Sequence, residues 1–235
     1  MTRELTGMIR PSSSAGSWVA RRSSSRPAAL YPLLRLAALA PDAAVAVFPS
    51  DHHFSDDRRF AAHVDSAFAT ADADPERVVL FGIIPDTHEA EYGWIEPGES
   101  LSVPTNRTAH RVRQFWEKPD PGFAETLRAR GGLWNSFVMV GRVRAFLALV
   151  RECLPALFDA FAALGALTGD EAEAIAPLYR WLPPSDFSRD ALSARPETLG
   201  VIPVWGVTWS DLGSPERVLR VRRIFEPRMR ELAQA

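Results

Sequence analysis

A group of three side chains able to ligate a metal or move a proton follows an apolar run near the start of the chain. The run Val45–Phe48 reads VAVF, and Pro49 leads from it to Asp51, His52 and His53. A short apolar run rich in valine is typical of a buried strand, so the three polar residues are expected at a strand end. Carboxylate and imidazole groups there can ligate a metal, hold a substrate or end the strand. For the histidines we favour capping the strand or orienting Asp51.

Further apolar runs are also followed by polar residues. These residues are Tyr92 and Gly93, Glu117 and Lys118, and Asp211. In open α/β sheets ligands bind beyond the carboxyl ends of the strands, so this recurrence predicts a small-molecule site. Lys118 is the only lysine in the chain. Its ammonium group suits a phosphate oxygen, because it acts as a point charge on a flexible stem.

The elements that must position these residues alternate between helix and strand. Helical spacing of apolar residues is found at 30–39, 57–71, 142–154, 157–167, 170–181 and from 214 onward. Strands are expected at 44–48, 77–85, 112–116, 136–140 and 199–208. Strands that are apolar on both faces belong to sheets covered by helices on both sides. The sequence therefore predicts a three-layer α/β/α sandwich with a mainly parallel sheet.

Composition limits the classes of function. The chain has 235 residues, of which 46% are hydrophobic and 24% charged, as in soluble globular proteins. A net charge of -2 gives no broad footprint for nucleic acid, and Pro41 and Asp42 interrupt the longest apolar stretch, which argues against a membrane span. Cys153 has no second cysteine to pair with. We therefore expect a cytoplasmic protein with small-molecule partners.

The first 28 residues differ in composition from the rest. They are rich in serine and arginine and show no apolar period. We expect residues 1–28 to be a disordered start outside the core, and residues 29–235 to form the folded domain.

Five ordered blocks of the chain resemble those of the sugar-1-phosphate nucleotidyltransferases, and most closely the mannose-1-phosphate guanylyltransferases. They are FPSDH at 48–52, GIIP at 82–85 with YGWIEPG at 92–98, FWEKP at 115–119, LWNS at 133–136 and WSDLG at 209–213. The resemblance covers roughly residues 30–219. It implies a Rossmann-like nucleotide-diphospho-sugar transferase fold. The implied enzyme joins a nucleoside triphosphate, here GTP, to a sugar 1-phosphate, here mannose 1-phosphate, and releases pyrophosphate.

The resemblance also implies a catalytic set. Asp51 and Asp211 match the two aspartates that ligate Mg²⁺ in the family, and Lys118 matches the lysine that holds the sugar phosphate. Such a transfer depends mostly on positioning and electrostatics, so no general base is required.

Three further residues match positions that bind the sugar. Glu117 is implied to accept hydrogen bonds from sugar hydroxyls, and Asn135 to contact the sugar through its amide. Gly93 matches a glycine that lets the backbone approach the sugar closely. Together with Lys118, these residues form the expected substrate-binding set.

The chain departs from the family at its start. The family's glycine-rich loop, of the form GGxGxRLxPLT, cradles the triphosphate, and no such segment occurs here. Residues 23–29, SSSRPAA, stand where the family has a segment like QPxNRGTAP. We therefore expect an N-terminally truncated domain that lacks its first strand and is impaired in catalysis. An exposed apolar sheet edge would favour association between copies. A smaller departure is Phe137, where many members have glycine.

Two other functions stay open. The sequence Asp51-His52-His53 is similar to the motif of the DHH phosphoesterases, in which such residues ligate Mn²⁺. The other alternative is a non-catalytic protein that binds a sugar phosphate through Glu117, Lys118 and Asn135 without binding nucleotide.

Overall fold

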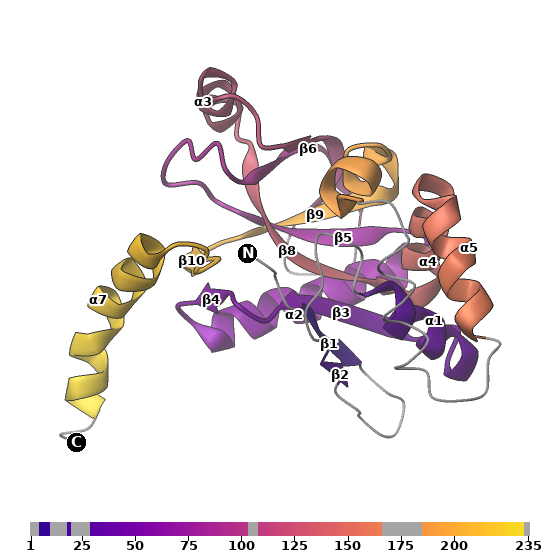
Figure 1. Cartoon of the computed structure of the whole chain (residues 1–235). Helices are drawn as coiled ribbons and strands as arrows, with labels where there is room; N and C mark the ends of the chain where they lie inside the picture. Colours follow the sequence, from indigo (N-terminus) through magenta and orange to yellow (C-terminus); the bar gives the residue numbers. More distant parts are fainter. Residues whose placement is uncertain (1–4, 10–17, 20–28, 103–107, 166–184, 233–235) are drawn as a thin grey trace.

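The structure is a computed structural model that describes residues 5–9, 18–19, 29–102, 108–165 and 185–232 (Figure 1). The helix expected at 170–181 lies outside these residues. The other predicted helices are present, and none of the helices among the described residues is long and apolar enough to cross a membrane.

One eight-stranded sheet runs through the described part of the chain. Its strands, in order across the sheet, are β2 (Trp18–Val19), β1 (Leu5–Ile9), β3 (Ala44–Pro49), β8 (Leu133–Arg142), β5 (Val78–Ile83), β9 (Leu199–Val204), β7 (Ala109–Glu117) and β6 (Gly93–Leu101). The first residues of β8 also pair with β6. A separate two-stranded ladder joins β4 (His53–Phe54) to β10 (Trp209–Ser210).

Helices cover the sheet on both faces, as Figure 1 shows. They are α1 (Leu30–Leu39), α2 (Asp57–Ala73), α3 (Pro121–Ala129), α4 (Val143–Cys153) and α5 (Pro155–Gly165), with short helical segments at Ser188–Leu192 and Pro196–Thr198. Helix α7 (Pro215–Leu232) projects away from the sheet (Figure 1). Alternate residues of β5 enter opposite cores: Val79 and Phe81 pack in the cluster that includes α2. Val78 and Leu80 pack in the cluster that includes α1 and α4. The predicted three-layer fold is confirmed.

The sheet is mixed, which corrects the expectation of a mainly parallel one. Among the described strands, β5 and β9 are the only parallel pair, and β8 runs antiparallel to β3 and β5 on either side of it. The sequence could not distinguish these arrangements. A continuous apolar run indicates only that both faces of a strand are buried. Since β8 is buried on both faces, its apolar run would be the same in a parallel and in an antiparallel arrangement.

Part of the Ser/Arg-rich start joins the sheet. Composition predicts a disordered segment here, and the resemblance implies that the family's first strand is missing. β1 pairs antiparallel with β3 from Leu5↔Pro49 to Ile9↔Val45, and β2 pairs with β1. Because a bare edge strand presents unpaired backbone groups, even a segment of weak apolar pattern can pair with it. In the structure β1 and β2 pair within the sheet and cover the edge of β3, while the expected disorder of residues 1–28 as a segment stays a prediction.

Cys153, at the end of α4, offers a test of local burial. Burial raises the pKa of its thiol above the ordinary value of 9.0, and the charge of Glu197 raises it further. Since the thiolate is the reactive form, we expect iodoacetamide to alkylate the native chain about tenfold more slowly at pH 8 than the urea-denatured chain. Glu197→Gln should speed the native reaction. Equal alkylation rates for the native and the denatured protein would contradict a raised pKa of the Cys153 thiol.

Candidate active site

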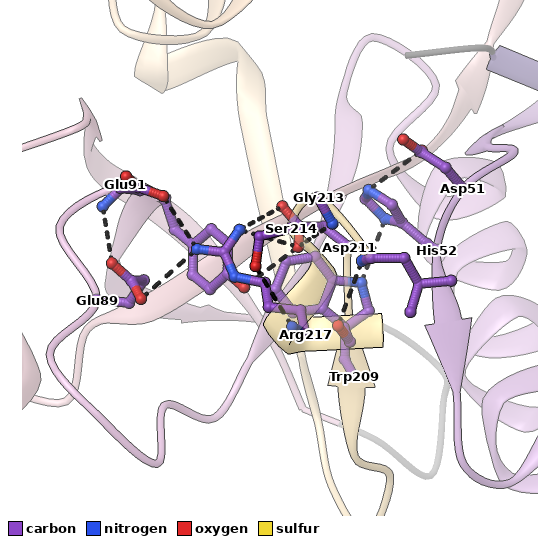
Figure 2. Close-up of polar contacts among 12 residues, drawn as sticks. Asp51, His52, Glu89, Glu91, Trp209, Asp211, Gly213, Ser214 and Arg217 are labelled. Atoms are coloured by element: carbon purple, nitrogen blue, oxygen red, sulfur yellow. Dashed lines mark hydrogen bonds and ion pairs between the residues drawn. The ribbon is translucent and has the colours of Figure 1, made fainter. Parts of the chain in front are cut away.

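The ladder between β4 and β10 places the two predicted metal ligands at one end of the same pair of strands. Ser210 pairs with His53, and Trp209 pairs with Phe54, in an antiparallel register. Asp51 and Asp211 therefore leave the ladder at the same end, although they come from distant parts of the sequence (Figure 2).

His52 lies between Asp51 and the aromatic ring of Trp209. The indole Nε1 of Trp209 donates a hydrogen bond to His52 Nδ1 at 3.2 Å. In the neutral ring, Nε2 then carries the proton, and this atom lies 3.8 Å from Asp51 Oδ1. The His52 side chain is only 1% exposed, so the imidazole is fixed and faces the carboxylate. This geometry agrees with the predicted orienting role.

The carboxylate of Asp211 is buried and already has hydrogen-bond partners within the protein. Asp211 is 1% exposed. Its Oδ1 accepts hydrogen bonds from Gly213 N at 3.1 Å and from the Tyr92 hydroxyl at 3.4 Å. Arg217 Nη1 lies 3.1 Å from each of its two oxygens. Burial, and next the negative charge of Asp211, raise the pKa of Tyr92, so its hydroxyl keeps the proton that it donates.

The turn after Asp211 requires an unusual backbone. Leu212 has φ 49°, in the left-handed region. A Cβ on Gly213 would lie 2.8 Å from Asp211 Oδ2, a distance that carbon atoms do not tolerate. The Ser-Asp-Leu-Gly sequence thus folds the chain tightly around the carboxylate and delivers Arg217, in the first turns of α7, to it.

Arg217 is the residue of this site that sequence reasoning missed. Its Nη2 lies 3.2 Å from Glu91 and 3.5 Å from Glu89, and its Cζ lies 4.6 Å from the centroid of the Tyr92 ring. Burial alone would lower the pKa of Arg217, but the surrounding acidic groups raise it. Nothing in the spacing of one arginine among many could have marked it, because its partners are brought together only by the fold.

The predicted sugar-binding residues form a row across three neighbouring strands. Glu117 on β7 pairs with Gly93 on β6. The register of β6 with β8, in which Trp94 pairs with Trp134, sets Gly93 level with Asn135. Lys118 follows directly after β7, is exposed and has φ 47°. The structure therefore brings Gly93, Glu117, Lys118 and Asn135 together.

Gly93 has a reason within the chain to be glycine. A Cβ there would lie 2.9 Å from Phe115 Cζ and 3.0 Å from Glu117 Oε2. The absence of a side chain therefore lets the Glu117 carboxylate lie against the backbone of β6. This adds to the role in sugar approach that the resemblance implies.

Asn135 presents a buried donor. The residue is 2% exposed, and its Oδ1 accepts a hydrogen bond from Phe137 N at 3.1 Å. Its Nδ2 has no hydrogen-bond partner among the described residues. A buried amide N–H without an acceptor costs free energy, unless a bound ligand accepts its hydrogen bond. Phe137 itself has φ 57°, so its backbone has the left-handed conformation that glycine adopts most easily.

The two aspartates fit a Mg²⁺ ion by the chemistry of their donors. Mg²⁺ prefers oxygen ligands and is usually held by one or two carboxylates, with water and substrate phosphate completing its shell. Within the described ranges, no three histidine, cysteine, aspartate or glutamate side chains gather as a metal cluster. The chemistry of the Asp51 and Asp211 carboxylates fits Mg²⁺, and their role as its ligands stays a prediction.

The chain, whose mixed sheet is covered by helices on both faces, matches a known family. The family model described as nucleotidyl transferase matches residues 28–226, and the chain belongs to this family. The prediction of family and fold is confirmed, and the family match argues against a DHH phosphoesterase.

The curated relatives that the chain matches include a mannose-1-phosphate guanylyltransferase and a xanthan biosynthesis protein. The chain is 32% identical over 193 residues to the mannose-1-phosphate guanylyltransferase of Escherichia coli K12, covering 78% of this chain and 40% of that protein. It is 38% identical over 120 residues to the xanthan biosynthesis protein XanB of Xanthomonas campestris, covering 51% of this chain and 24% of that protein. The chain thus spans less than half the length of these curated relatives.

A solved structure shares the fold. It is from Thermus thermophilus, is named mannose-1-phosphate geranyltransferase, and aligns with a TM-score of 0.69 at 24% identity. The alignment covers 82% of this chain and 52% of the other.

Proposed function

We propose that the chain takes part in the transfer of a guanylyl group from GTP to mannose 1-phosphate, with Mg²⁺ and with release of pyrophosphate. The observation that carries this proposal is the position of Asp51 and Asp211 at the same end of the β4–β10 ladder, in a chain of the nucleotidyl transferase family. The row of Gly93, Glu117 and Asn135 supports a sugar as the second substrate.

The chain's own residues then have separate roles. Asp51 and Asp211 would hold Mg²⁺, which when bound neutralises charge on the α-phosphate. Lys118 would hold the sugar phosphate by charge. Glu117 would accept hydrogen bonds from sugar hydroxyls, and Asn135 Nδ2 would donate one. No side chain needs to remove a proton, because the attacking phosphate oxygen is already ionised.

The proposal is tested by incubating the purified protein with GTP, mannose 1-phosphate and Mg²⁺ and measuring GDP-mannose by chromatography. We expect product formation that Asp51→Asn abolishes. Product formation from UTP or ATP but not from GTP would overturn the choice of nucleotide. Absence of product from every pair of nucleoside triphosphate and sugar phosphate would overturn catalysis by this chain.

A second candidate is binding of a sugar phosphate without nucleotide transfer. It is favoured by one observation: in the sugar-binding row the buried Asn135 Nδ2 has no hydrogen-bond partner among the described residues. Calorimetry separates the two candidates. Binding of mannose 1-phosphate together with GTP supports transfer, whereas binding of mannose 1-phosphate alone supports the second candidate.

Lys118→Ala gives a prediction common to both candidates. We expect it to weaken binding of mannose 1-phosphate about tenfold, because it removes the positive charge beside the row of sugar-binding residues. The measurement is calorimetric titration at low salt. Arg113→Ala is the matched control, since Arg113 lies on β7, the strand that Lys118 follows, is 67% exposed and pairs with Glu96. An equal loss in both variants would show a general effect of charge.

A further inference from the structure

The guanidinium of Arg217 already contacts Asp211, one of the two proposed metal ligands. Both carboxylate oxygens of Asp211 lie 3.1 Å from Arg217 Nη1, and the Arg217 side chain is 20% exposed (Figure 2). A charge-assisted contact of this kind is among the stronger hydrogen bonds in proteins. The carboxylate therefore has less negative charge and less lone-pair capacity to offer a second cation.

The surroundings provide another position for the guanidinium. Nη2 of Arg217 lies 3.2 Å from the Glu91 carboxylate and 3.5 Å from that of Glu89. A small rotation of the long side chain could keep these two contacts while it leaves Asp211. The hydrogen bonds from Gly213 and Tyr92 reach Oδ1, whereas Arg217 Nη1 contacts both oxygens, so Arg217 is the partner that a cation at Oδ2 would displace.

We propose that Arg217 and a divalent cation are alternative partners of Asp211. Binding of the cation moves the guanidinium toward Glu89 and Glu91, and removal of the cation returns it. Arg217 is thus a further residue of the site, which keeps the buried carboxylate neutralised when no metal is bound. Because Arg217 lies in α7, metal binding also changes how the start of this helix is held. The inference rests on the proposed role of Asp211 as a metal ligand.

The test measures binding of Mn²⁺ alone, without nucleotide, from the electron paramagnetic resonance signal of the free ion. We expect Arg217→Gln to bind Mn²⁺ about tenfold more tightly than the unmodified chain, because the competing positive charge is gone. Arg217→Lys keeps the charge and should stay close to the unmodified chain. Arg220→Gln is the matched control, because Arg220 lies in the same helix and pairs with Asp86 at 3.0 Å, and it should leave Mn²⁺ affinity unchanged.

The double variant Asp211→Asn with Arg217→Gln separates this inference from the proposed function. Loss of the tight Mn²⁺ binding in the double variant supports both. If the double variant binds as tightly as Arg217→Gln, Asp211 is not the ligand and both fail. If Asp211→Asn alone weakens Mn²⁺ binding but Arg217→Gln does not strengthen it, or if no variant binds Mn²⁺, the competition is overturned. Circular dichroism of each variant confirms that the fold is intact.

Discussion

Replacing Asp211 with alanine is expected to lower the free energy of unfolding by about 2 kcal/mol and to abolish nucleotidyl transfer. The carboxylate is 1% exposed and accepts hydrogen bonds from Gly213, Tyr92 and Arg217. Without it, two of these donors are left buried and the guanidinium loses its most buried partner. Urea unfolding followed by circular dichroism measures the loss of stability.

Asp86→Ala is the matched control for this effect. Asp86 also pairs with an arginine of α7, Arg220, but its side chain is 54% exposed. Exposed ion pairs contribute little, so we expect a change of no more than about 0.5 kcal/mol. Asp211→Asn should fall between the two alanine variants, because its amide oxygen can still accept hydrogen bonds. Equal losses for Asp86→Ala and Asp211→Ala would show that burial does not determine the contribution of Asp211.

The strand-end argument explains why much of the site could be predicted from the sequence. Asp51 follows a strand whose apolar run is readable, and Asp211 lies in a block whose order along the chain is specific. The β4–β10 ladder that joins them is two residues long in each strand, too short to be visible as a pattern. The sequence therefore marked Asp51 and Asp211 as candidates, while their position at one end of the same ladder depended on the fold.

Other features of the fold could not be predicted from the sequence, because they depend on tertiary contacts. The direction of β8 is set by its neighbours, since burial on both faces gives the same apolar run for either direction. The left-handed backbone at Phe137 lies where the register of β5 with β8 shifts between Leu80 and Gly82. A bulge of this kind leaves no clear mark in a sequence when the residue is not glycine.

Trp94→Ala is expected to have the largest effect on stability, a loss of about 4 kcal/mol in the free energy of unfolding. The side chain is 0% exposed. Trp94 pairs with Trp116 on one side and with Trp134 on the other, so its removal leaves a cavity at the centre of the strands that carry the sugar-binding row. Its indole Nε1 also donates a hydrogen bond to the backbone oxygen of Glu89 at 2.9 Å. Thermal and urea unfolding measure the loss.

Trp205→Ala makes the same chemical change at a side chain that is 61% exposed. It should cost less than about 1 kcal/mol, because little apolar surface returns to water. The two variants also differ in their effect on the site. Loss of the Trp94 hydrogen bond frees the segment of Glu89, whose carboxylate faces Arg217. At a temperature where the variant is folded, Trp94→Ala should therefore still weaken mannose 1-phosphate binding, and Trp205→Ala should not. If Trp94→Ala had the stability and the mannose 1-phosphate affinity of the unmodified chain, Trp94 and its cross-strand partners Trp116 and Trp134 would not support the sugar-binding row.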